Sequence, residues 1–197
     1  MRHAVTLFSG LGSSSEALRQ IGYKVIPHDF NAAAVKTLLS NGFLEARQVD
    51  VRDIDYSNYP EVDVVAGGPP CQPFSQAGAQ KGEYDPRDMI PEFVRAVSEL
   101  QPQVFVMEEV KTLTWKKNRP YLDRVVEDLT ALGYVVEWEV LDASEYGIGQ
   151  ARKRLFVVGV RRDIALLEER NDHLEQESIR LATRLGRVIF AATDGGE

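Results

Sequence analysis

The sequence predicts an α/β fold: a Rossmann-like, doubly wound, mostly parallel sheet with helices on both faces. Short runs rich in β-branched and aromatic residues alternate with stretches of helical periodicity along the 197 residues. Glycines stand between several of these segments, where a strand turns into a helix or a helix ends. Strands separated by helices pair in parallel, because the crossover helix returns the chain to the same end of the sheet.

The first part of the chain contains the clearest strand, turn and helix pattern. Its first strand breaks at a glycine turn, and the serines that follow can cap a helix that stops at Gly22. Strands are expected over residues 4–8, 24–28, 48–50 and 62–66, and helices over about 13–20 and 32–40.

The second part continues the alternation and then changes character. Strands are expected over residues 104–107, 135–140 and 154–160, and helices over about 91–100 and 121–132. From residue 164 the chain is rich in charge, with apolar residues at helical spacing. We therefore expect a main domain over 1–163 and a C-terminal helical extension over 164–197.

Composition excludes several classes of protein. The 30 acidic and 23 basic residues give a net charge of −7, which disfavours nonspecific coating of nucleic acid but leaves room for a local basic surface. A single cysteine excludes an intramolecular disulfide and a zinc site with several thiolates, so no metal site is expected. The sequence shows neither an apolar run long enough to span a membrane nor a secretory leader. We expect a soluble protein in a reducing, cytoplasmic setting.

Two strand ends suggest an adenosine-containing cofactor. The turn of Phe8, Ser9, Gly10, Leu11 and Gly12 lets a ligand approach the backbone at a helix N-terminus. Asp29, about twenty residues later, can accept hydrogen bonds from a ribose diol. Phe30 can pack on adenine and Asp50 can accept from its amine, although a plain surface or core role is equally open for these two.

Three further segments can carry chemistry. A loop constrained by glycine and proline over 67–75 presents the only cysteine, Cys71, which favours a nucleophile over an inert buried thiol. Glu108 and Glu109 follow the next core strand and point to opposite sides, so only one of them is expected to share a pocket with Cys71. The segment over 150–154 leads into the last strand, and alternation places Gln150, Arg152 and Arg154 on one side of it, where they can bind phosphate or polarise a carbonyl.

Taken together, these ordered motifs over residues 4–163 resemble the DNA (cytosine-5) methyltransferases. The resemblance implies the S-adenosylmethionine-dependent methyltransferase fold, with S-adenosylhomocysteine as the product. It implies cofactor contacts at the 8–12 turn and at Asp29, Phe30, Asp50, Val51, Gly68 and Pro70. It also implies substrate contacts at Gln72, Ser75, Lys81, Arg87 and Gln150, in part through a mobile loop over 76–88.

The catalytic roles implied by this resemblance concern four residues. Cys71 attacks C6 of cytosine, Glu108 protonates or hydrogen-bonds N3, and Arg154 steadies the charge at O2. Arg152 supports the base and the loop. The enzyme would then be a DNA (cytosine-5-)-methyltransferase acting on a base flipped out of the duplex.

The chain departs from the family pattern in two ways. Glu109 stands where the family has asparagine. We expect this change to alter proton donation by Glu108 or the setting of the catalytic loop, and so to slow turnover or change substrate choice. After residue 163 only 34 residues remain, and no target-recognition region or final conserved motifs are recognisable in them. We expect a minimal enzyme, or a catalytic half completed by a second polypeptide or by a homodimer.

A basic cluster could contact the nucleic acid backbone. Its members are Lys111, Lys116, Lys117, Arg119 and Arg124, with Trp115 and Tyr121 between them, and the basic residues over 152–162. A solvated loop is an equally open interpretation. Two other functions also stay open: a non-catalytic regulatory protein that binds cofactor or DNA, and an RNA cytosine-5 methyltransferase. A prokaryotic or phage setting with restriction-modification fits the leading interpretation.

Overall fold

The structure is a computed structural model that describes residues 1–70, 87–147 and 149–169, with side chains as far as residue 165. Four predicted site residues lie outside the described residues: Cys71, Gln72, Ser75 and Lys81. Most of the predicted loop over 76–88 and most of the predicted extension over 164–197 lie outside them as well.

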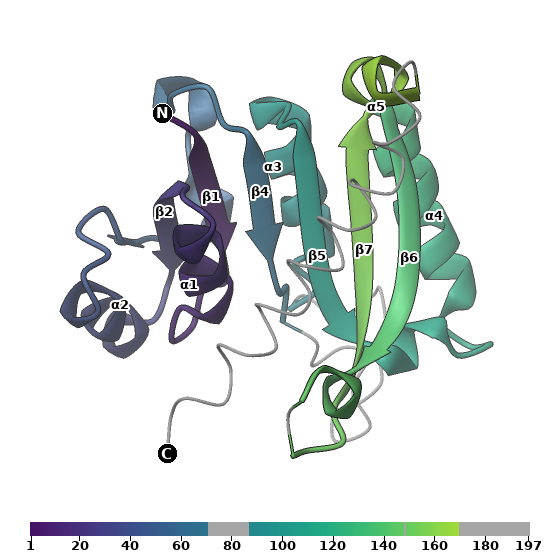
Figure 1. Cartoon of the computed structure of the whole chain (residues 1–197), viewed down its shortest axis with the longest axis horizontal. Coiled ribbons are helices and arrows are strands. Elements are labelled where there is room, and N and C mark those ends of the chain that lie inside the picture. The colour runs from purple at the N-terminus through teal and green to yellow at the C-terminus, as the bar shows by residue number, and fades with distance from the viewer. Residues whose placement is uncertain (71–86, 148, 170–197) are drawn as a thin grey trace.

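A seven-stranded sheet forms the centre of the molecule, in the order β3-β2-β1-β4-β5-β7-β6 (Figure 1). The strands are β1 (His3–Leu7), β2 (Lys24–Asp29), β3 (Arg47–Gln48), β4 (Val64–Gly67), β5 (Val104–Val110), β6 (Tyr134–Asp142) and β7 (Lys153–Arg161). The α-helices are α1 (Ser13–Gln20), α2 (Ala32–Ser40), α3 (Ile90–Leu100), α4 (Arg119–Ala131) and α5 (Arg162–Glu169). The predicted α/β class and the alternation of strands and helices are confirmed.

The sheet is mostly parallel, as expected, and its exception is β7. Strands β3, β2, β1, β4 and β5 pair in parallel, whereas β7 runs antiparallel between β5 and β6. The chain between β6 and β7 contains only the short 3-10 helix η5 (Ala143–Tyr146) within its described part. With no crossover helix to carry it back, β7 returns directly alongside β6.

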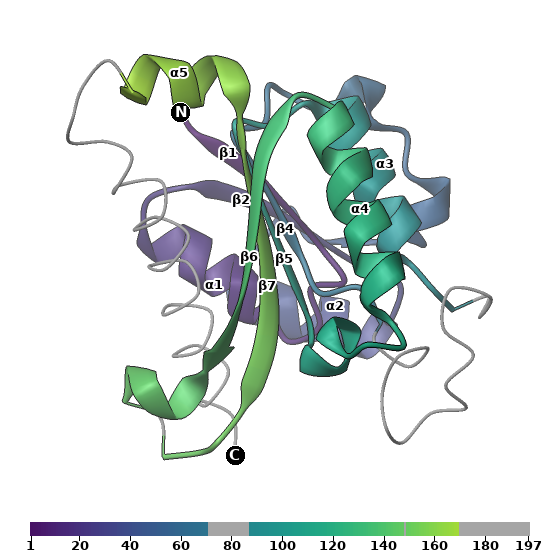
Figure 2. The same cartoon turned by 90° about the vertical axis from the view of Figure 1, so that its right-hand side faces the viewer.

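Helices cover both faces of the sheet (Figure 2). On one face α3 and α4 pack on a core that includes Phe93, Phe105 and Leu122. On the other face Leu18 of α1 and Leu38 of α2 belong to a second core. Helix α5 begins directly after β7, so the predicted boundary between 163 and 164 falls inside this helix.

Several element bounds differ from the sequence-based expectation in ways that affect the site. Strand β5 continues to Val110, so Glu108 and Glu109 are part of the strand and do not follow it. Strand β3 ends at Gln48, so Asp50 does not end it and instead caps the 3-10 helix η1 (Val51–Asp53). No helix in the described part of the chain is long and apolar enough to cross a membrane.

Candidate active site at the carboxyl edge of the sheet

The predicted cofactor residues meet at one edge of the sheet because β1, β2, β3 and β4 are parallel. Leu7 pairs with Gly67 and Asp29 pairs with Gln48, so the segments that follow these four strands all leave the same edge. The arrowheads of β1, β4 and β5 mark this edge at the bottom of Figure 1. Ligands of open α/β sheets bind outside the carboxyl ends of the strands.

The turn after β1 is held open by glycine conformations and a hydroxyl cluster. Gly10 and Gly12 have φ of 52° and 100°, and Phe8 also has a positive φ of 54°. Below the turn, Thr6 Oγ1 lies 2.8 Å from both Ser9 Oγ and Ser15 Oγ. These bonds fix the loop that leads into the N-terminus of α1.

Asp29 ties the turn to the second strand. Its carboxylate is largely buried, with Oδ2 accepting from Gly10 N and Oδ1 from Asn31 N, both at 2.8 Å. Each oxygen keeps a second acceptor site for a ligand hydroxyl. Next to it, the Phe30 side chain is 70% exposed, so an aromatic surface is free to cover a flat ring.

His28 is a structural partner of this turn that the sequence analysis missed. The imidazole is fully buried, with Nδ1 at 3.2 Å from Thr6 O and Nε2 at 2.6 Å from the Tyr59 hydroxyl. Burial lowers the pKa of His28 to about 4, so the ring is neutral, with Nδ1 donating to the carbonyl and Nε2 accepting from the phenol. Only its position directly before Asp29 could have drawn attention to it.

Asp50 lies at the same edge but is already engaged by Arg52. Its Oδ1 accepts from Arg52 N at 3.0 Å and from Arg52 Nε at 2.9 Å. These side-chain and backbone hydrogen bonds lower the pKa of Asp50 to about 2, so the carboxylate stays ionised. Val51, the next residue, is buried and points its side chain into the core.

The segment after β4 passes close to β5. A Cβ on Gly67 would lie 2.9 Å from Leu7 O, so only glycine fits this close approach of two strands. A Cβ on Gly68 would lie 3.7 Å from Glu108 O, which puts the chain leading to Pro70 beside the strand of Glu108.

Glu108 and two arginines form the charged centre of the described site. Glu108 Oε1 lies 3.4 Å from Arg152 Nη2 and 3.4 Å from Arg154 Nε. Antiparallel pairing brings them together, because Glu108 is opposite Phe156 and Val110 is opposite Arg154. Asp142 at the end of β6, which the sequence analysis missed, accepts from Arg152 N at 3.2 Å and orients this segment.

Glu109 points to the other face of the sheet, as the alternation predicts. Its side chain is 2% exposed; Oε2 accepts from Val110 N at 2.9 Å, and Oε1 has no hydrogen-bond partner within the described part of the chain. Burial raises the pKa of Glu109 to about 8, with smaller contributions from Asp88 and Glu108. The side chain therefore holds a proton at neutral pH.

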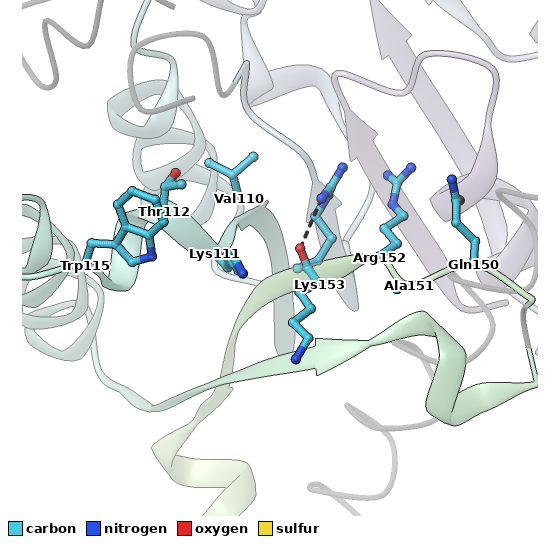
Figure 3. A pocket seen from close by; sticks show the side chains of 9 residues that line it. Val110, Lys111, Thr112, Trp115, Gln150, Ala151, Arg152 and Lys153 are labelled. Atoms are coloured by element: carbon cyan, nitrogen blue, oxygen red, sulfur yellow. Dashed lines mark hydrogen bonds between the residues drawn. The ribbon is translucent and has the colours of Figure 1, made fainter. Parts of the chain in front are cut away.

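A pocket of about 620 Å³ opens next to the arginines (Figure 3). It is lined by Val110, Lys111, Thr112, Trp115, Gln150, Ala151, Arg152, Lys153 and Arg154. The structure thus brings Gln150, Arg152 and Arg154 together, and adds part of the predicted basic cluster. Figure 3 shows Trp115 on one side of the pocket and Gln150 on the other.

Other members of the predicted basic cluster lie elsewhere. Arg161 pairs with Asp163 at the opposite edge of the sheet, because β7 is antiparallel, so the basic run over 152–162 is not one surface. Tyr121 donates to the Asp88 carboxylate and is not a free stacking surface. Arg119 stacks over Trp138 and pairs with Asp123. Arg87 is exposed directly before Asp88.

Comparison with known proteins decides the family. The model of the C-5 cytosine-specific DNA methylases matches residues 3–191. The chain belongs to this family. The match supports the resemblance found in the sequence and continues past the predicted domain boundary at 163.

The relatives of this chain include type II methyltransferases from bacteria and orphan methyltransferases from phages. M.AplI of Arthrospira platensis is 39% identical over 77% of this chain and 44% of its own length. The orphan methyltransferase M.SPRI of Bacillus phage SPR is 35% identical over 84% of this chain and 39% of its own length. The chain thus spans about half the length of the curated relatives it matches.

Solved structures show the same fold. A protein described as a DNA modification methyltransferase encoded within an E. coli prophage matches with a TM-score of 0.68 and 26% identity, over 84% of this chain and 48% of its own. A DNMT2 mutant of Spodoptera frugiperda matches with a TM-score of 0.64 and 21% identity, over 82% of this chain and 50% of its own, which supports the fold alone.

Proposed function

We propose that this methylase transfers a methyl group from S-adenosylmethionine to C5 of cytosine in DNA. One observation carries the proposal: Glu108 lies between Arg152 and Arg154, on a strand beside the segment that leads to Cys71. An acid paired with two guanidinium groups, on a strand beside the segment that leads to a cysteine, matches what activation of a cytosine ring requires. The relatives support a bacterial or phage setting.

The cofactor would lie along the carboxyl ends of β1, β2, β3 and β4. The exposed ring of Phe30 and the open turn at Gly10 fit a flat base and a ribose, and Asp29 has acceptor sites left for the ribose hydroxyls. The other proposed contacts, which follow the ends of these strands, are Ser9, Leu11, Gly12, Asp50, Val51, Gly68 and Pro70. When bound, S-adenosylmethionine supplies a methyl group on a sulfonium that a carbon nucleophile can displace.

The residues of the chain would make cytosine C5 into such a nucleophile. The Cys71 thiolate adds to C6, while Glu108 donates a proton or hydrogen bond to N3 and Arg154 steadies the charge at O2. The electron pair then lies on C5, which takes the methyl group. A base removes the C5 proton, and β-elimination releases Cys71 and restores the ring. Arg152 holds Glu108 in place, as its 3.4 Å contact indicates.

The pocket beside the arginines would receive the nucleic acid. Lys111 and Lys153 are exposed on its rim, and Trp115 is 44% exposed on its wall. Cations neutralise phosphates, and an exposed indole stacks on an unpaired base. A base flipped out of a duplex can stack on such a ring while the phosphates beside it meet the cations. A second polypeptide, or a second copy of the chain, is the proposed source of sequence recognition.

Methyl transfer from tritiated S-adenosylmethionine tests the proposal. The purified chain is compared with Cys71→Ser on duplex DNA, single-stranded DNA and tRNA. Label on cytosine of DNA that is lost in the variant supports the proposed reaction. Label on tRNA alone would replace it with RNA modification, and binding of cofactor without any transfer would favour a regulatory protein or a missing partner.

A further inference from the structure

Arg95 connects helix α3 to the turn that follows Asp50. Its Nη2 donates to Val51 O at 2.6 Å, and its Nη1 donates to Ile54 O at 3.3 Å. Donor and acceptors are 44 and 41 residues apart, so only the tertiary fold brings them together. The two carbonyls belong to the first helical residue of η1 and to the residue that ends it.

The rest of the guanidinium is oriented by its own helix. Nε lies 2.7 Å from Glu92 Oε2 and Nη1 lies 2.9 Å from Glu99 Oε1, one turn before and one turn after Arg95. The guanidinium carbon lies 5.2 Å from the centroid of the buried Tyr56 ring. A planar group with several fixed donors can serve two carboxylates and two carbonyls together, which the single ammonium of lysine cannot.

The turn held by Arg95 carries part of the proposed cofactor site. Asp50, the proposed partner of the adenine amine, caps η1, and Val51, another proposed cofactor contact, begins it. We infer that Arg95 is a positioning residue that holds the 50–54 turn in the conformation that binds the adenine end of the cofactor. This inference rests on the proposed function.

Calorimetric binding of S-adenosylhomocysteine and of adenosine to the purified full chain tests the inference. Arg95→Lys keeps the charge but loses the fork of donors, and we expect it to weaken both ligands by the same factor. If the ordered fraction of the turn falls to about a tenth, the apparent affinity falls about tenfold. We expect the two affinities to fall by the same factor because both ligands contain adenosine.

Arg161→Lys is the matched control. Arg161 also pairs with a carboxylate, Asp163, at 2.8 Å and donates to a distant carbonyl, Gln101 O, at 2.7 Å, but at the opposite edge of the sheet. We expect it to lower the melting temperature as Arg95→Lys does, without changing either affinity. Hydrogen exchange adds a readout without ligand: the amides of Asp53 and Ile54, bonded to Asp50 O and Val51 O, should exchange faster only in Arg95→Lys.

The outcomes separate this inference from the proposed function. Failure of the wild-type chain to bind S-adenosylhomocysteine would reject the cofactor assignment and the inference with it. Wild-type binding that Arg95→Lys leaves unchanged would overturn the role of Arg95 alone. Loss of affinity for S-adenosylhomocysteine but not for adenosine would also overturn it, because the effect would then lie at the amino-acid end of the ligand.

Discussion

The stability of the protein should depend on pH through Glu109, and Glu109→Gln isolates this dependence. Glutamine has nearly the same shape but no charge, so it can occupy the same buried site beside Val110 at any pH. In the wild-type chain, ionisation would place an uncompensated charge on Oε1, which has no hydrogen-bond partner among the described residues.

The free energy of unfolding is expected to fall as the pH rises, because folding raises the pKa of Glu109. The pKa of Glu109 is raised to about 8 in the folded protein from the ordinary glutamate value of 4.5, so the folded state binds the proton more tightly than the unfolded chain does. This contribution is fully present below pH 4.5 and is lost as the pH rises through 8. Between these two pH values, each pH unit lowers the free energy of unfolding by about 1.4 kcal/mol. By pH 7 the wild-type chain has therefore lost about 3 kcal/mol of stability.

Urea unfolding between pH 5 and pH 8, followed by tryptophan fluorescence, measures the effect. The free energy of unfolding of Glu109→Gln should match the wild type near the acidic end and exceed it by about 3 kcal/mol at neutral pH. Glu127→Gln, which removes a charge from an exposed position on α4, is the control for net charge. A difference between Glu109→Gln and wild type that stays constant over this range would refute the reasoning.

Four further outcomes are expected. Glu108→Gln removes the proton donor and should lower methyl transfer by about 10²- to 10⁴-fold, and a loss below tenfold would argue against its role. Trp115→Ala should weaken binding of a single-stranded oligonucleotide about 5- to 150-fold in fluorescence anisotropy, and Trp115→Phe should restore most of the affinity. Equal binding by all three proteins would show that the indole does not contact the oligonucleotide. Gly12→Ala, at φ 100° and with Leu38 Cδ2 only 2.7 Å from the new Cβ, should cost about 1–3 kcal/mol, and more than Gly133→Ala at φ 97° in open space. Glu109→Asn should raise turnover in the methyl-transfer assay, and unchanged turnover would show that the acid does not slow the enzyme.

Local patterns were enough to predict the fold class and to nominate the residues of the candidate site. The glycine turn after the first strand, the loop before Cys71 and the alternation around Glu108 each depend on residues that are close in sequence. Alternation alone indicated that Glu108 and Glu109 face opposite sides, and the structure agrees. Period-two geometry needs no knowledge of what packs on either face.

Long-range contacts decided which side chains of the site are protonated and how they are held in place. The burial of Glu109 near Asp88, the bond of His28 to Tyr59 and the contact of Arg95 with Val51 each depend on residues that are far apart along the chain. Sequence patterns predict which side of a strand a residue faces, but a pKa depends on solvent exclusion and on charges from other elements. The amino-acid sequence therefore determined which chemical groups stand at the edge of the sheet. Only tertiary packing decided which of these groups are buried, paired or free, because desolvation and hydrogen bonding depend on the whole fold.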